Sequence, residues 1–233
     1  MTMFRPRRHS ILRQPKLIFA PLAYLKLQYF CHAGDTEVGG FAITASKRPL
    51  YVQEFVTLAQ DTNPIAVKFH DDAVADYFDQ CVDRGLAPEQ FARIWLHTHP
   101  GDSVIPSLTD EQTFDRVFGH CHWAVMAILG RTGRTSARLA VHSGIRLDLE
   151  IGVRVDWAAW PDALAQEAAY FDWLLDEWQK EYHANIHPMP RIGGMDQPLL
   201  LDPFAAVVCP SVGDGDELLD RSISSGGLDE PVI

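Results

Sequence analysis

The sequence predicts an α+β fold with a mainly antiparallel β-sheet and one long helix near the C-terminus. Three observations lead to this fold class. With 233 residues, 47% of them apolar and 22% charged, the chain has the size and composition of one globular domain with extensions. Helix-like and strand-like patterns are mixed along the sequence. Strand patterns joined by short turns outnumber the possible crossover helices, which favours α+β over a doubly wound parallel sheet.

The N-terminal part begins with a basic arm and continues into a helix and a hairpin. Residues 1–16 carry five basic side chains, no acid and little apolar periodicity, so they are predicted to form an arm. Apolar positions recur at helical spacing over residues 20–30 and predict a short amphipathic helix. Residues 37–45 and 50–58, on either side of Pro49, are rich in β-branched and aromatic residues and predict a hairpin.

The middle of the chain alternates between strand and helix. Residues 65–69 predict a third strand. Helical periodicity follows over residues 71–84, with acids in the first turn, and Gly85 ends the helix. Residues 93–99 then return to strand character, and the strand stops at Pro100.

The second half continues the same mixture of elements. A helix is predicted over residues 109–118, and a long helix over residues 162–182. Between them, three strands are predicted at residues 123–129, 135–142 and 145–155. This order of elements places the strand at 93–99 inside one continuous domain.

The predicted organisation is a core with a helical extension and a tail. The core spans residues 17–156, and the C-terminal helix spans residues 157–184. Residues 185–233 are rich in proline and glycine and become acidic toward the end, so this tail is expected to be flexible. No internal repeat is recognisable.

Charge and apolar runs exclude several classes of function. The formal net charge of −11 argues against nonspecific binding to nucleic acid or to an anionic membrane, because both need clustered Lys and Arg. No run approaches the roughly 20 apolar residues of a membrane-spanning helix. We therefore expect a cytoplasmic protein. The four cysteines form no C-x-x-C pair, and they are predicted to be buried, reduced thiols.

Two histidines and an aspartate have the spacing of a metal site. Successive side chains of a strand point to opposite faces, so His97 and His99 should share one face. Ser107 and Asp110 stand at the predicted start of the next helix, which would bring Asp110 near the end of that strand. Two imidazoles and one carboxylate are a common catalytic ligand set for Zn²⁺, and they leave one coordination position open.

A simpler interpretation exists for each part of this pattern. An S-x-x-D pair often does no more than cap a helix, and a histidine pair on one strand is often hydrogen-bonded structure. The full pattern H-x-H-x7-S-x-x-D is expected by chance in roughly 0.002 places per chain of this composition. The combination therefore indicates a metal site more strongly than either part alone.

The run LHTHP at residues 96–100, together with SLTD at 107–110, resembles the signature of the JAMM (MPN+) zinc metalloproteases of the prokaryotic type. The resemblance covers about residues 20–150. The resemblance implies a curved sheet flanked by helices, with Zn²⁺ on His97, His99 and Asp110. It also implies a catalytic base on an early strand, and Glu37 in the run EVGGF at residues 37–41 fits that place. By spacing alone Glu54, on another early strand, remains open as the base.

The resemblance also implies an activity and roles for side chains. Glu37 would accept a proton from the attacking water, and Ser107 would donate its hydroxyl to the developing oxyanion. The expected substrate is a ubiquitin or ubiquitin-like protein, cleaved at the amide after its C-terminal Gly-Gly. A peptidase for a sulfur-carrier protein or a smaller peptide, and a non-catalytic scaffold subunit of the same fold, are the alternatives. The remaining histidines without matching partners are expected to be structural or exposed: His70, His120, His122 and His142.

Overall fold

The structure is a computed structural model that describes residues 14–161 and 168–189. Most of the predicted basic arm, the first residues of the predicted long helix at 162–167 and the predicted tail from residue 190 lie outside the described residues. The described part contains every helix and strand that the sequence predicts within it, with several additional short elements.

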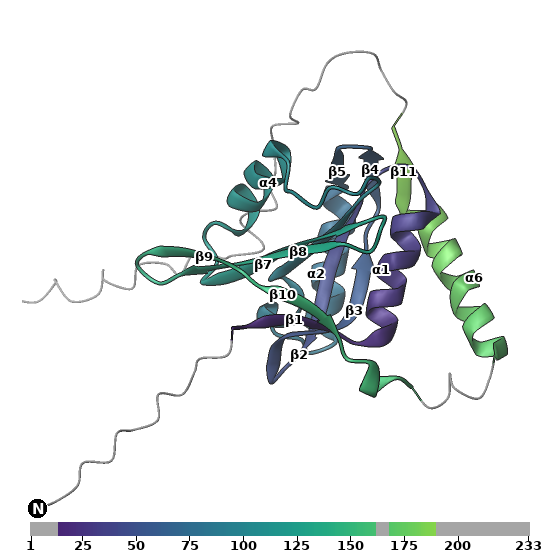
Figure 1. The fold of residues 1–233 in the computed structure, drawn as a ribbon, viewed down its shortest axis with the longest axis horizontal. Coiled ribbons are helices and arrows are strands. Elements are labelled where there is room, and N and C mark those ends of the chain that lie inside the picture. Colours follow the sequence, from purple (N-terminus) through teal and green to yellow (C-terminus); the bar gives the residue numbers. More distant parts are fainter. Residues whose placement is uncertain (1–13, 162–167, 190–233) are drawn as a thin grey trace, which may run out of the picture.

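An eight-stranded sheet in the order β10-β1-β3-β2-β6-β7-β8-β9 forms the centre of the fold (Figure 1). Four of its neighbouring pairs are antiparallel and three are parallel, so the predicted α+β class with a mainly antiparallel sheet is confirmed. The strands are β1 (Lys16–Phe19), β2 (Val38–Ala45), β3 (Arg48–Thr57), β6 (Ile94–His99), β7 (Trp123–Gly130), β8 (Thr135–His142), β9 (Arg146–Glu150) and β10 (Gly152–Val155).

The two ends of this sheet are neighbouring parts of one segment. The sequence predicts a single strand over residues 145–155, and the structure divides it at Ile151 into β9 and β10. The backbone N–H of Ile151 donates to the Ala137 carbonyl at 2.9 Å, so the segment stays beside β8 as it passes from one strand to the other. Because β9 pairs with β8 and β10 pairs with β1, the sheet curves until its two ends meet.

A small second sheet in the order β11-β4-β5 lies beside the main one. It consists of β4 (Gln60–Asn63), β5 (Ala66–Phe69) and β11 (Ile186–Pro188), and only β5 is predicted by the sequence. β4 is built of polar residues and β11 has three residues, so neither carries a hydrophobic period from which it could be recognised. β11 pairs with β4 in parallel, which joins the C-terminal part of the described chain to an early strand.

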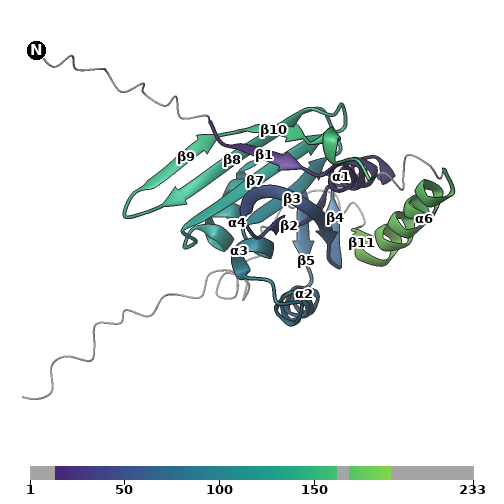
Figure 2. The ribbon, with the colours of Figure 1, turned by 90° about the horizontal axis from the view of Figure 1, so that it is seen from below.

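Helices cover both faces of the main sheet (Figures 1 and 2). The α1-side core packs α1 (Pro21–Ala33) and α6 (Ala168–Asn185) against residues such as Leu96. The α4-side core packs α2 (Asp71–Asp83), α3 (Pro88–Phe91) and α4 (Leu108–Phe118) against residues such as Trp95. A 3₁₀ turn, η1 (Trp157–Ala159), follows β10. No helix in the described part of the chain has the length and apolarity needed to cross a membrane.

A polar network fixes α6 to the sheet. Glu181 accepts a hydrogen bond from the Thr57 hydroxyl at 2.6 Å, and its second carboxylate oxygen lies 2.7 Å from the Lys26 ammonium. Asn185 donates to the Thr57 carbonyl at 3.1 Å. These bonds join α6, α1 and β3, so the described part of the predicted C-terminal helix is packed into the domain.

Candidate metal centre

β6 lies in the middle of the sheet and positions the two histidines of the predicted site. Alternate residues of this strand face opposite cores: Leu96 lies in the α1-side core and Trp95 in the α4-side core. His97 and His99 continue the face of Trp95, with ring centroids 4.4 Å apart for Trp95 and His97 and 5.2 Å apart for the two histidines. The two imidazoles therefore lie side by side, as the strand period predicts.

Asp110 reaches the same place from the first turn of α4. Ser107 caps this helix: its hydroxyl accepts the Asp110 backbone N–H at 3.1 Å, and the Asp110 carboxylate accepts the Ser107 N–H at 2.7 Å. Such a reciprocal capping box satisfies two helix donors and fixes the carboxylate. The simpler interpretation of the S-x-x-D pair is thus correct, and the same geometry also holds Asp110 beside the histidines.

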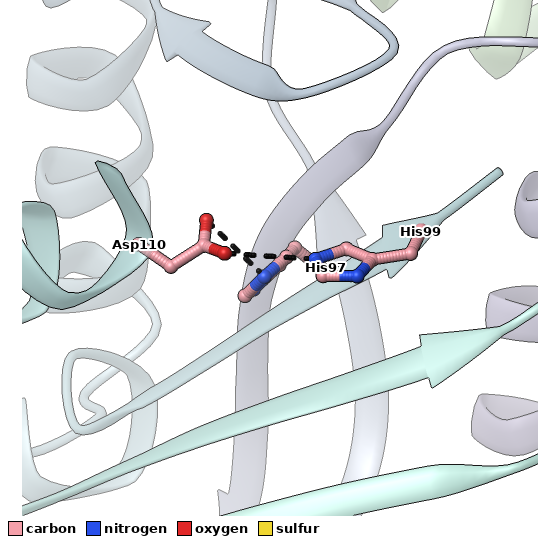
Figure 3. A group of neighbouring side chains, drawn as sticks. All are labelled: His97, His99 and Asp110. Atoms are coloured by element: carbon pink, nitrogen blue, oxygen red, sulfur yellow. Dashed lines mark ion pairs between the residues drawn. The ribbon is translucent and has the colours of Figure 1, made fainter. Parts of the chain in front are cut away.

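The three side chains converge on one point (Figure 3). The Nε2 atom of His97 lies 3.5 Å from Oδ1 of Asp110, and Nε2 of His99 lies 3.6 Å from Oδ2. The potential ligand atoms of all three residues lie within 4.8 Å of one another, and all three side chains are buried. The separations exceed ordinary hydrogen bonds, but they leave room for a cation between the atoms.

The loop after β6 fixes the tautomer of His99. Its Nδ1 lies 2.9 Å from the Ser103 carbonyl oxygen. A carbonyl can only accept, so Nδ1 carries the hydrogen, and in the neutral ring the lone pair is on Nε2, on the side of Asp110. Metal-binding histidines are commonly oriented in this way by a backbone carbonyl.

His97 is fully buried, and among the described residues neither of its ring nitrogens has a hydrogen-bond partner. The Nε2 atom of His99 is also buried and has no hydrogen-bond partner among these residues. Burial lowers the pKa of His97, which keeps its imidazole neutral and its lone pair available. Buried polar atoms without partners are costly unless a ligand satisfies them, so these nitrogens fit a bound metal ion.

Glu37 directly precedes β2 and enters the site through the register of that strand. Val38 pairs with Thr98, which brings Glu37 beside His99. Its Oε1 lies 3.6 Å from His99 Nε2, and the side chain is only about 4% exposed. Burial raises the pKa of Glu37 to about 8, with the nearby His99 lowering it and Asp110 raising it. A buried carboxyl with this pKa is a good proton acceptor and donor near neutral pH.

The charges of the other site residues depend on one another. Burial acts to raise the pKa of Asp110, but His97 and His99 outweigh it, and the net pKa lies far below the ordinary value. Burial acts in the opposite direction on His99, where contacts with Asp110, Glu37 and the Ser103 carbonyl raise the net pKa. Asp110 is therefore the firmly ionised acid of the site, and its buried negative charge suits a cation.

The two glycines after Glu37 are explained by close packing. A Cβ on Gly40 would lie 2.3 Å from the Val56 carbonyl oxygen, and a Cβ on Gly39 would lie 2.9 Å from a methyl carbon of Val67. Side chains at these positions would push β3 or β5 away from β2. The glycines therefore hold the strands close together immediately behind Glu37.

The other sequence candidates lie elsewhere. Glu54, the alternative base, is half-exposed on β3 and lies 3.6 Å from Arg84 of the α2 C-terminus. His70 pairs with Asp61 at 3.2 Å, and His142 is bonded through Nδ1 to the Cys121 carbonyl oxygen at 2.7 Å. None of them belongs to the metal-ligand cluster found in the described ranges.

Sequence reasoning missed two contributors to the site. Trp95 stacks on His97 with an angle of 25° between the rings, and its position two residues before His97 on a strand was a usable signal. Ser103 acts through its backbone carbonyl, which no side-chain pattern could have indicated.

Comparisons with known proteins gave no match for this chain, neither to a family model nor to the sequence of a curated protein.

Proposed function

We propose that this chain is a zinc-dependent JAMM-type metallopeptidase that hydrolyses the amide bond after the C-terminal Gly-Gly of a ubiquitin or ubiquitin-like protein. The single observation that carries the proposal is the buried convergence of His97, His99 and Asp110, with imidazole nitrogens that lack other partners. Glu37 beside His99 adds the acid–base group that hydrolysis needs. The curved sheet with helices on both faces is compatible with a JAMM core.

His97, His99 and Asp110 would hold the ion. When bound, Zn²⁺ supplies Lewis acidity for the scissile carbonyl and lowers the pKa of water toward roughly 7. In the reaction Glu37 accepts a proton from the attacking water and later delivers it to the departing amine, so no covalent enzyme intermediate is needed. Positive charge beside Glu37 favours its ionised form, which is the form that accepts the proton.

Ser107 combines two roles in this proposal. Its oxygen accepts the Asp110 N–H, which uses a lone pair and leaves the hydroxyl hydrogen free to donate. That hydrogen stabilises the negative oxygen of the tetrahedral intermediate. Because the cap holds Ser107 in place beside a metal ligand, the donor needs no rearrangement as charge develops.

The Gly-Gly substrate in this proposal rests on the sequence resemblance, and a physical argument agrees with it. A diglycine tail lacks side chains and can enter a narrow site in an extended conformation. α4 ends at Phe118 and β7 begins at Trp123, so only a short turn follows the metal-binding helix and no large insertion contacts a second substrate protein there. We infer recognition of one carrier protein at a time, without selection of a chain linkage.

The test combines zinc quantification with a panel of ubiquitin, ubiquitin-like and sulfur-carrier proteins, each fused through Gly-Gly to a reporter. The wild type should bind one equivalent of zinc and release the reporter, with mass spectrometry locating the cut after Gly-Gly. Glu37→Gln should retain zinc and lose about 10²- to 10⁴-fold in turnover. His97→Ala should lose both zinc and turnover.

Glu54→Gln is the matched control, because Glu54 lies on the neighbouring strand and is paired with Arg84 outside the site. It should behave like the wild type. A zinc-loaded wild type that cleaves no member of the panel would contradict the proposed substrate class. A wild type that binds no stoichiometric zinc would contradict the metallopeptidase and favour the scaffold function instead.

A further inference from the structure

The hairpin of β8 and β9 ends in an exposed edge strand. Within the described ranges β9 pairs with β8 only, and all five of its residues are exposed. Figure 2 shows the turn of this hairpin extending away from the helices. An edge strand presents unpaired N–H and C=O groups that can pair with another strand.

The hydrogen bonds around the hairpin show which backbone groups of β9 are free. Ile151 donates to the Ala137 carbonyl of β8 at 2.9 Å, and Ile145 accepts from the Ser143 N–H at 3.1 Å. In an antiparallel pair the direction of the backbone groups alternates, so odd-numbered residues here bond to β8. The N–H and C=O groups of Arg146, Asp148 and Glu150 therefore point to the open edge.

The side chains of β9 divide sharply between its two faces. Ile145, Leu147 and Leu149 lie on one face and are 78%, 50% and 37% exposed. Leu147 and Leu149 pair with Val141 and Leu139 of β8, so the apolar face extends inward from the edge. Arg146 lies on the other face, where it contacts Asp115 of α4 at 2.6 Å and Asp148 at 2.9 Å.

We propose that β9 is a self-association edge, where a second copy of this chain adds its own β9 in antiparallel register about a two-fold axis at Leu147. In this register Leu147 faces the same residue of the second copy, and Ile145 faces Leu149. Arg146 faces Asp148 of the second copy, and the symmetry repeats that pair. Opposite charges and apolar residues that face each other across strands are stabilising.

Self-complementarity selects a second copy as the occupant. A two-fold axis brings every residue opposite one from the same strand, and here each apolar residue meets an apolar one and each Arg146 meets an acid. The backbone agrees with this pairing, because Arg146 and Asp148 both direct their free groups to the open edge. Moving the axis to Asp148 would place two carboxylates directly opposite each other, which is unfavourable. The register about Leu147 avoids that contact.

The first experiment measures mass by light scattering over a concentration series, in the presence and absence of chelator. The wild type should form a dimer of twice 26.1 kDa. Leu147→Asp should shift the chain to the monomer by placing like charges at the axis. Its melting temperature should stay close to that of the monomeric wild type, because the replaced side chain is half-exposed. The proposal concerns assembly alone, so its outcome is independent of zinc binding and hydrolysis.

The second experiment tests the register by oxidation. Facing residues that do not bond each other's backbone have Cα atoms about 4.5 Å apart, within the range of a disulfide. Leu147→Cys should therefore form a covalent dimer. Leu149→Cys is the matched control, because its symmetry copy lies four residues along the strand, about 13 Å away, and should not cross-link.

A wild type that stays monomeric at every concentration would overturn the proposal. If deletion of residues 1–13 then produced a dimer, the N-terminal segment of the same chain, and not a second copy, would be the partner that binds the β9 edge. A dimer that persists in Leu147→Asp, or that cross-links more readily through Leu149→Cys than through Leu147→Cys, would equally overturn the proposed pairing.

Discussion

His97 is predicted to reduce the stability of the metal-free protein, and replacing it with leucine tests this directly. Both ring nitrogens of His97 are buried without hydrogen-bond partners among the described residues. An unsatisfied buried polar group costs about 1–3 kcal/mol. Leucine has a similar volume and no polar atom. The substitution removes the ring stacking on Trp95, for which aromatic pairs gain about 0.5–1.5 kcal/mol.

The substitution also removes the contact with the buried Asp110 carboxylate, 3.5 Å from Nε2. Taking about 2 kcal/mol for each nitrogen, about 1 kcal/mol for the lost stacking and about 2 kcal/mol for the lost Asp110 contact, His97→Leu should stabilise the metal-free protein by about 1 kcal/mol. For a domain of this size that corresponds to a melting temperature higher by about 2–4 °C. The order should reverse with zinc: at a free concentration 1,000-fold above its Kd, a ligand adds about 4.1 kcal/mol to the wild type. The variant lacks a ligand and should gain much less.

The assay is thermal unfolding followed by circular dichroism, once with EDTA and once with excess zinc. His142→Leu serves as the control, because the ring of His142 is hydrogen-bonded to the Cys121 carbonyl. Its replacement should destabilise the protein by about 0.5–1.5 kcal/mol under both conditions. If His97→Leu melts well below the wild type in EDTA, the ring nitrogens are satisfied without metal and the reasoning fails.

Three further predictions concern residues around the site. The pKa of Glu37 is about 8 in the metal-free fold and roughly 4.3 in an unfolded chain, so its protonation stabilises the fold at low pH and this contribution is lost as pH rises toward 8. In urea denaturation with EDTA, Glu37→Gln should therefore gain stability relative to the wild type between about pH 5 and pH 8. A stability difference that does not change with pH would refute the shift. Gly40→Ala should lower the free energy of unfolding by about 1–3 kcal/mol, because the added methyl group meets the Val56 carbonyl. Gly85→Ala is its control, because at Gly85 no atom lies nearby but φ is 73°, so this variant measures backbone strain without a clash. Ser107→Ala should cost about 1 kcal/mol through loss of the helix cap, and a denaturation midpoint equal to that of the wild type would argue against the cap.

The candidate site was largely predictable because its pattern is local. The two-residue period of a strand is enough to place His97 and His99 on one face. A capping box within four residues fixes where α4 begins and therefore where Asp110 points. Both signals depend on backbone geometry over short distances, which the sequence determines strongly.

Features that depend on distant partners were not predictable in the same way. β4 and β11 are short, and they pair with each other although they lie far apart in sequence. Spacing could not choose between Glu37 and Glu54. The pairing of Val38 with Thr98 gives a geometric reason to prefer Glu37 as the base, since it brings Glu37 beside His99. Glu54 instead faces Ile43 further along β2.

The joining of both sheet ends by one late segment has a consequence for how the chain is made. β1 stands between β3 and β10, so it has only one neighbour until residues 152–155 have left the ribosome. A nascent chain that stops before that point keeps two open edges, which are the places where incomplete sheets aggregate. We expect the cotranslational intermediate to depend on chaperones until this last strand arrives, and protease resistance of stalled chains should rise abruptly there.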